Sequence, residues 1–163
     1  MKKKVFVLMA FLCVAAISRA YGFGIGAQLN FRAGSIFAPG AALLISPSDK
    51  THLAANWYFG SDKNTIIGLT LDAVPLTFPF IKGDAATFNF NLGAGLFLNA
   101  ILSDNFGINC GLRIPVGFNL LLGKDVFEIF THVAPSFGVD FLPSLGFSSP
   151  FFPIALGARI WFR

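Results

Sequence analysis

Residues 88–99 read FNFNLGAGLFLN, an alternation in which every second residue is apolar. Successive side chains of a β-strand point to opposite faces of the sheet. The second face is mostly asparagine and glycine, with Phe97 as its one large apolar residue, and is too polar for a hydrophobic core. The pattern therefore predicts a β-barrel whose apolar face contacts lipid and whose polar face lines the centre. The apolar face carries Phe88, Phe90, Leu92, Ala94, Leu96 and Leu98.

The same alternation recurs along the chain and predicts an all-β fold, an eight-stranded antiparallel up-and-down transmembrane barrel. Residues 74–86 are expected to form a longer connection, and residues 138–150 the last loop. Pro115 and Pro135 lack the N–H that a closed ladder needs, so we expect a bulge or an interrupted ladder at each. The strands are expected at about 22–32, 36–46, 51–59, 65–73, 88–102, 106–118, 126–137 and 152–162.

The first twenty residues are expected to be a cleaved secretory signal. Lysines occupy positions 2–4, an apolar run covers 5–17, and small residues stand at positions 18 and 20 of the cleavage site. A single membrane helix is the first alternative, but the run is shorter than the roughly 18–20 residues that it needs. A lipid attached at Cys13 is the second, but Leu12 is bulky where a small residue is required. We therefore expect a signal peptide at 1–20 and one barrel domain at 21–163.

Composition narrows the class of protein. The chain has 163 residues, 55% hydrophobic and 12% charged, with 12 Lys and Arg against 8 Asp and Glu. Four of the basic residues fall in the expected signal, so the remainder is formally neutral and no nucleic-acid partner is expected. Cys110 would remain as a lone thiol, which cannot form an internal disulfide bond. After residue 20 no run of about 18 apolar residues occurs, which disfavours helical membrane spans.

The C-terminal residues 155–163 read ALGARIWFR. This ending resembles the C-terminal targeting signal of bacterial outer-membrane barrels, a glycine followed by hydrophobic or aromatic residues at spacings of three and five. Gly157, Ile160 and Phe162 fit that pattern, whereas Arg163 departs from it because such chains commonly end on the aromatic residue. The resemblance implies recognition by the outer-membrane insertion machinery.

The chain after residue 20 resembles the small eight-stranded outer-membrane barrels of the OmpA, OmpX and OmpW kind. The segments 39–44 (PGAALL), 68–72 (GLTLD) and 155–162 (ALGARIWF) are similar to a family of spirochaete surface barrels whose role is largely undefined. The resemblance implies a location in the outer membrane of a diderm bacterium, within its lipid bilayer. It also implies host-protein binding of the sort proposed for some members.

Eight strands enclose a space that side chains just fill. Buried charges in such a space must pair or contact water. Glu128 near the start of one predicted strand and Arg159 near the end of the next lie at similar depths, so we predict that they form an ion pair. Arg113 and His132 are expected nearby and complete what we call the lumen polar cluster. Two roles remain open for this cluster, a polar plug that holds the barrel closed and a path for ions or protons.

The last loop is unusually apolar for a segment that should contact water. We group Phe141, Leu145, Phe147 and Phe151 as a candidate apolar rim. One interpretation is an aromatic belt at the membrane interface. The other is a mouth that binds a lipid-like molecule or a host protein, because exposed apolar patches usually mark contacts.

No enzyme class fits the sequence. His132 and Ser136 share a face, but they lie two inward positions apart, beyond hydrogen-bond reach along one strand. Neither they nor His52 offers a base held by an orienting partner, so we expect no catalytic residues, no cofactor and no metal site.

The sequence favours an integral outer-membrane barrel with a plugged or very narrow lumen and a structural or surface-binding, adhesin-like role carried by its loops. A narrow channel for small hydrophobic or polar solutes, which the resemblance to the OmpW kind implies, is the alternative. A secreted soluble barrel of lipocalin type would need a polar exterior, which the alternation opposes.

Overall fold

The computed structural model describes residues 22–34, 37–60, 65–83 and 85–162. The expected signal peptide at 1–20 and the final Arg163 lie outside these residues. Within the described part, no helix is long and apolar enough to cross a membrane. The strands are β1 (Phe23–Ala33), β2 (Ala38–Ser48), β3 (Thr51–Phe59), β4 (Thr65–Lys82), β5 (Ala86–Leu102), β6 (Gly107–Arg113), β7 (Val116–Leu122), β8 (Phe127–Val133), β9 (Ser136–Leu142), β10 (Gly146–Phe147) and β11 (Phe152–Phe162).

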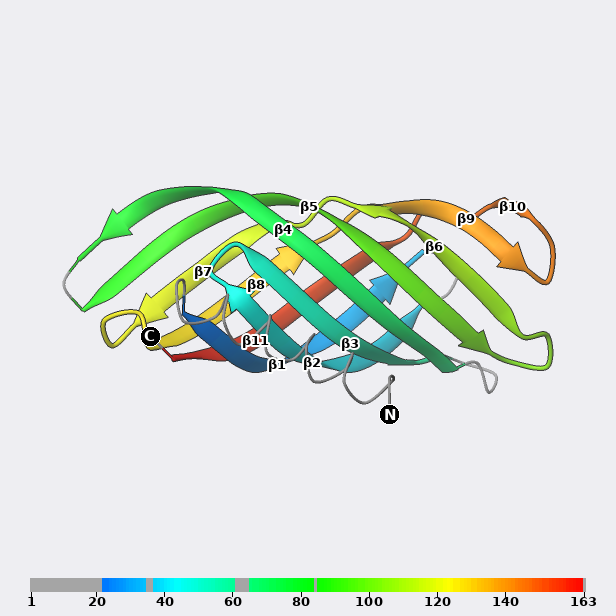
Figure 1. The fold of residues 1–163 in the computed structure, drawn as a ribbon, viewed down its shortest axis with the longest axis horizontal. Coiled ribbons are helices and arrows are strands. Elements are labelled where there is room, and N and C mark those ends of the chain that lie inside the picture. The colour runs from blue at the N-terminus through cyan, green and yellow to red at the C-terminus, as the bar shows by residue number, and fades with distance from the viewer. Residues whose placement is uncertain (1–21, 35–36, 61–64, 84, 163) are drawn as a thin grey trace, which may run out of the picture.

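The strands close into an antiparallel barrel (Figure 1). From β1 to β5 each strand pairs with the next, and β11 pairs with β1 to close the ring. β6 and β7 both pair with β5, one after the other, and so form a single interrupted strand. β8 pairs with β7, and β9 pairs with β6, so β8 and β9 form a second interrupted strand. The barrel therefore has the eight antiparallel strands that the sequence predicts.

The two interruptions fall at the prolines, as expected. The backbone carbonyl of Pro115 accepts a hydrogen bond from the Gly93 N–H at 2.9 Å, and that of Pro135 accepts one from the Ile114 N–H at 3.0 Å. The pairing register is the same on both sides of each proline. Each interruption therefore removes ladder bonds without a bulge, and the side chains beyond it keep their facing.

The predicted ends of two strands are wrong. β4 continues to Lys82 and pairs with β5 through two register irregularities, so residues 74–86 are not a loose connection. Those irregularities lie between Ala73 and Leu76 and between Pro79 and Ile81, and they accommodate the two prolines that suggested a loop. β9 similarly runs to Leu142 and continues into a small hairpin with β10, which shortens the predicted last loop.

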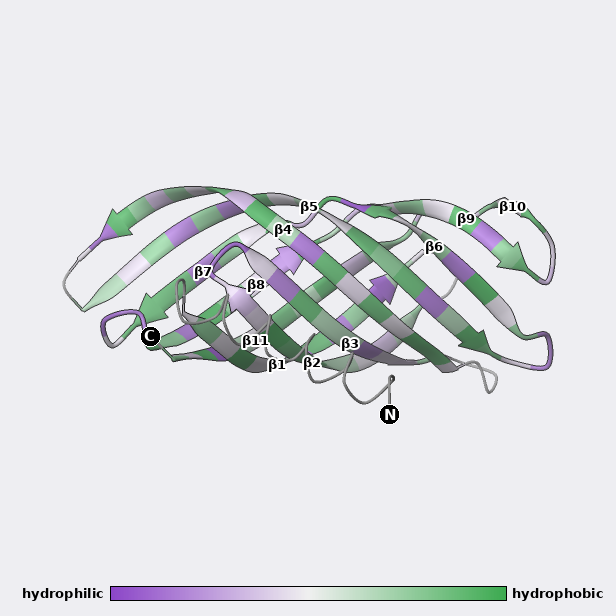
Figure 2. Ribbon diagram, in the orientation of Figure 1, coloured by the Kyte–Doolittle hydropathy of each residue, from purple (hydrophilic) through white to green (hydrophobic). Residues whose placement is uncertain are grey.

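The barrel is apolar outside and polar inside, the reverse of a soluble barrel. Along most strands the hydropathy alternates (Figure 2), and exposed positions are mostly Leu, Ile and Phe. Inward positions are enriched in Asn, Gly and paired charges, although β2 has Ala and Leu on its inner face as well. An exterior of this kind is stable only in contact with lipid, so the barrel is of the membrane type.

The stagger of the strands sets their tilt. Following the pairings once around the barrel returns to β1 about ten residues from the starting point. For eight strands this stagger corresponds to a tilt of about 40° from the barrel axis. The eleven residues of β1 therefore span about 28 Å along the axis.

Candidate functional site

The barrel has two different ends. At the chain-end side, β1 begins and β11 ends, and the connections between β2 and β3 and between β7 and β8 are short. At the loop side lie the connections between β1 and β2, β3 and β4, β5 and β6, and β9 and β11. These two names are used below to locate residues in the lumen.

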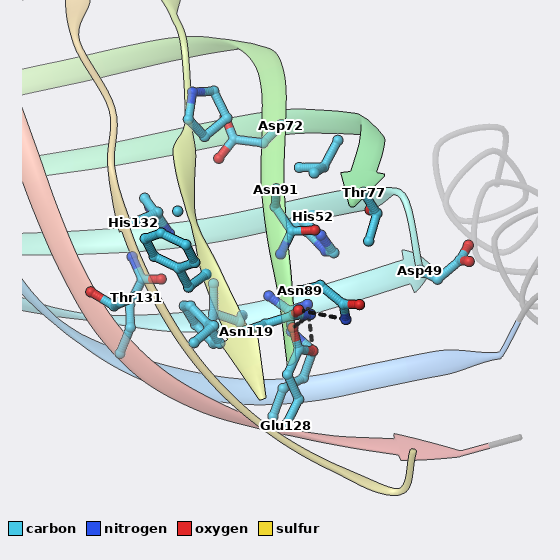
Figure 3. Close-up of a pocket in the computed structure, with 18 of the residues that line it drawn as sticks. Asp49, His52, Asp72, Thr77, Asn89, Asn91, Asn119, Glu128, Thr131 and His132 are labelled. Carbon is cyan, nitrogen blue, oxygen red and sulfur yellow. Dashed lines mark hydrogen bonds and ion pairs between the residues drawn. The ribbon is translucent and has the colours of Figure 1, made fainter. Parts of the chain in front are cut away.

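Glu128 is the centre of the network nearest the chain-end side. Its neighbour across the β8–β11 pairing is Arg159, and the two carry the predicted ion pair, with Arg159 Nη1 3.1 Å from Glu128 Oε2. The Trp161 indole N–H donates to the same oxygen at 2.7 Å. Asn119 donates to the other oxygen at 2.7 Å and itself accepts from Asn89 at 2.9 Å (Figure 3). The carboxylate is thus satisfied on both oxygens while only 4% exposed.

Arg113 forms the second ionic contact of the lumen, halfway along the barrel. Its Nε lies 3.3 Å from Asp72 Oδ1, and its Nη2 lies 3.3 Å from His132 Nε2. Asp72 and Arg113 are on strands separated by β5, and the position between them is Gly95, which pairs with both. A Cβ at Gly95 would overlap the Asp72 carboxylate, so glycine is required there. The lumen polar cluster therefore forms two groups, Glu128 with Arg159 and Arg113 with His132, and the structure adds Asp72 to the second.

Asp72 was not assigned to the cluster from the sequence. Its strand is two strands away from that of Arg113, so no pairing of neighbouring strands indicated the contact. The available signal was the inward glycine of the intervening strand, which leaves room for an arginine to reach across.

The loop-side half of the lumen is filled. The Arg32 guanidinium lies 3.7 Å from the centre of the Phe151 ring, and that ring contacts Phe97 edge-to-face at 5.0 Å. Tyr58 and Ile66 pack together nearby and are 4% and 0% exposed. Large side chains therefore close the barrel toward its long connections, in a layer that we call the loop-side plug: Arg32, Tyr58, Ile66, Phe97 and Phe151.

Amides line the middle of the lumen on β1, β3 and β4. Gln28 donates to Asn30 at 2.7 Å, Asn30 donates to Asn56 at 2.9 Å, and Asn56 donates to Thr70 at 3.4 Å. On the opposite wall Asn99 donates to Asn109 at 3.0 Å. These hydrogen bonds tie neighbouring strands together from inside.

A cavity of about 220 Å³ occupies the remaining space. Its walls include Asp49 and Lys50 of the β2–β3 turn, the amides Asn89 and Asn91, and both ion pairs (Figure 3). Members of the loop-side plug do not line it. The lumen is therefore a blind pocket, lined by both apolar and charged or amide side chains, in the half of the barrel nearest the chain-end side.

Three of the four residues of the candidate apolar rim are exposed. Phe141, Leu145 and Phe147 are 52%, 77% and 94% exposed on the loop side. Phe151 is 4% exposed and belongs to the loop-side plug, so its assignment to the rim is wrong. Its backbone pairs with Ser136, which directs the side chain into the barrel instead of toward solvent.

The three residues of the expected insertion signal lie on β11, the strand that closes the barrel against β1. Ile160 and Phe162 face outward and are 48% and 58% exposed. Gly157 faces inward, where a Cβ would overlap the Phe130 ring. A spacing of three places the glycine and the first apolar residue on opposite faces, as strand geometry requires.

The two histidines have different polar partners. His132 contacts Arg113, while Ser136 donates to a backbone carbonyl instead of to His132. The structure does pair His52 Nδ1 with Ser46 Oγ at 2.9 Å, a contact that the sequence analysis missed. Ser46 is completely buried. Within the described part of the chain, no group of three or more His, Cys, Asp or Glu residues could hold a metal ion.

No model of a protein family matches this chain, and no curated protein matches it. Three similar solved structures are membrane barrels. Neisserial surface protein A is 12% identical, with 86% of this chain and 96% of that chain covered and a TM-score of 0.47. The N-terminal β-barrel domain of Pseudomonas aeruginosa OprF is 13% identical, with 85% and 97% covered and a TM-score of 0.41. Ail of Yersinia pestis is 14% identical, with 86% and 97% covered and a TM-score of 0.42.

Proposed function

We propose that the protein is an integral outer-membrane barrel with a plugged lumen, and that its role is structural or surface-binding. The observation that supports a closed barrel is the loop-side plug, in which Tyr58, Ile66, Phe97 and Phe151 are each less than 5% exposed. An ion entering the cavity from the chain-end side would have to displace this layer in order to leave. The buried charges below it are paired with each other, as a structural role requires.

Recording from the protein in planar lipid bilayers tests the plug directly. We expect no stable single-channel conductance at moderate voltage. Reproducible unitary steps from the unmodified protein would contradict the proposal and favour the second candidate, a narrow channel for small solutes. The observation that favours this second candidate is the cavity of about 220 Å³, which already provides half of a path.

A surface-binding role would use the exposed part of the apolar rim. Phe141, Leu145 and Phe147 gather on the loop side, which in an outer-membrane barrel faces the outside of the cell. We infer that they contact a host protein or a lipid-like molecule, and that the protein is not an enzyme. A relationship to spirochaete surface barrels, and recognition of Gly157, Ile160 and Phe162 by the insertion machinery, belong to the same proposal.

The rim is tested by a Phe141→Asp, Phe147→Asp double variant displayed on whole cells. Adhesion of these cells to immobilised serum proteins and to phosphatidylcholine vesicles is compared with that of cells displaying the unmodified barrel. We expect adhesion to fall about tenfold while the amount of heat-modifiable, folded barrel is unchanged. Equal adhesion by the two barrels would remove the rim from the proposal.

A further inference from the structure

The two halves of the barrel differ in height. On one half lie β1, β2, β3 and β11, which have 11, 11, 9 and 11 residues. On the other half β4 has 18 residues, β5 has 17, and the interrupted strands run from Gly107 to Leu122 and from Phe127 to Leu142. At the tilt found above, the short wall is about 23–28 Å tall and the tall wall about 40 Å. Figure 1 shows β4 and β5 running past the ends of the shorter strands.

The outward face of the tall wall is mostly apolar. Its charged residues all stand at inward positions of the strand alternation. Asp72, Arg113 and Glu128 are buried in the lumen, whereas Lys82 and Asp140, near opposite ends of the wall, are exposed and half-buried. Its end at the chain-end side is an exposed group of side chains, with Phe78, Phe80 and Ile81 49%, 64% and 66% exposed. Phe88 and Phe118 stack beside them with ring centres 5.5 Å apart.

A single bilayer cannot cover both walls. The apolar band of an outer-membrane barrel is about 25 Å tall, which fits the short wall and leaves about 15 Å of the tall wall uncovered. Apolar surface of this extent is unfavourable in water and marks a contact. Tilting the whole barrel does not help, because bringing 40 Å down to 25 Å would need a rotation of about 50°.

We propose that the tall wall is a self-association surface that packs against the tall wall of a second copy. Any partner must present an apolar face of the same height at the same depth in the membrane. A second copy inserted in the same direction meets this condition, because a two-fold axis along the membrane normal sets each level of the wall against itself. This proposal is independent of the lumen and of the apolar rim.

The contact area indicates a reversible association. Two convex walls meet over the width of about two or three strands, or 10–14 Å, and over about 40 Å of height. Each copy then buries about 500 Å², which is below the roughly 800 Å² per partner of a standard stable interface. The mismatch with the bilayer supplies the rest of the driving force, so association should weaken in thicker membranes.

The test uses the protein reconstituted into phosphatidylcholine vesicles whose acyl chains have about 14, 18 or 22 carbons. Association is measured by energy transfer between copies labelled at Asn105→Cys in a Cys13→Ser, Cys110→Ala background. We expect the association constant to fall at least about tenfold from the thinnest to the thickest bilayer. A protein that is monomeric in all three bilayers, or that associates equally in all of them, would overturn the proposal.

A pair of variants then locates the surface. Phe80→Ser, Ile81→Ser shortens the tall wall at the chain-end side and should lower association at least fivefold in the thinnest bilayer. Phe31→Ser, Phe59→Ser makes the matched change on the short wall, where these residues are 44% and 52% exposed, and should leave association unchanged. Equal losses in the two variants, each checked for folding by heat-modifiable migration, would also overturn the proposal. The thickness series on the unsubstituted wall decides the matter even if a variant fails to fold.

Discussion

Replacing Glu128 by alanine is the sharpest test of the lumen as a structural element. The carboxylate receives hydrogen bonds from Asn119, Arg159 and Trp161, and it is the ionic partner of Arg159. The substitution leaves the Arg159 guanidinium buried, at 4% exposure, without its counter-ion. Breaking a buried ion pair on one side typically costs about 3–5 kcal/mol.

The position of the pair refines this range. Glu128 and Arg159 both line the cavity of about 220 Å³, so water can approach the orphaned guanidinium from the chain-end side. Partial hydration places the expected loss at the lower end, about 3 kcal/mol. Glu128→Gln keeps an acceptor for Trp161 and Asn119 but loses the charge, and should cost less, about 1–2 kcal/mol.

The loss is measured by urea unfolding of the barrel in detergent micelles and by the temperature at which its heat-modifiable migration is lost. Asp104→Ala, an exposed acidic residue in the β5–β6 connection, is the control and should change the free energy of unfolding by less than about 0.5 kcal/mol. If Glu128→Ala were as stable as this control, the pair would have no structural role. Stability unchanged together with a new or altered conductance would instead support the ion or proton path.

Three further predictions concern other parts of the barrel. Removing two rings of the loop-side plug with Phe97→Ala, Phe151→Ala should produce unitary conductance in planar bilayers, because the blind cavity then extends toward the loop side; a silent but folded variant would mean that other side chains suffice to close it. Gly157→Ala should destabilise the barrel by about 1–3 kcal/mol because the new Cβ meets Phe130, whereas Gly146→Ala, with no atom within 4 Å, should be neutral in the same urea titration. Pro115→Val should add about 0.5–1 kcal/mol by restoring a ladder N–H, without moving the register; a loss of stability would mean that the proline conformation itself is needed.

The alternation of residue types was sufficient to predict which way side chains face. A period of two does not depend on turn geometry. The two strands interrupted by Pro115 and Pro135 therefore keep the same facing beyond each proline, where Phe118 and Phe137 point outward. The pairing of Glu128 with Arg159 was accessible for a related reason. Those residues lie on neighbouring strands of the barrel, and the register of that one pairing determines whether they meet.

Strand ends were harder to predict because a proline occurs both in loops and at irregularities inside strands. Pro75 and Pro79 suggested a loop between β4 and β5, yet both lie at irregularities that a twisted hairpin tolerates. Phe151 was assigned to the rim because it was placed in a loop, where no alternation of residue types indicates whether a side chain points inward or outward. Its bridge to Ser136 is a long-range backbone contact, which no local pattern encodes.

Height along the barrel is the property that local patterns leave out. A period of two gives the face of each residue, whereas the level at which Asp72 meets Arg113 depends on the sum of the registers between their strands. One added residue in any turn would shift that sum and reverse inside and outside on one strand. The glycine at position 95 restricts the choice, because the charged pair can form only where the intervening strand has no side chain. An inward glycine such as Gly95 therefore indicates the height at which two strands can be bridged, which the apolar alternation does not. It allows an arginine to pair across the one intervening strand in a lumen this narrow.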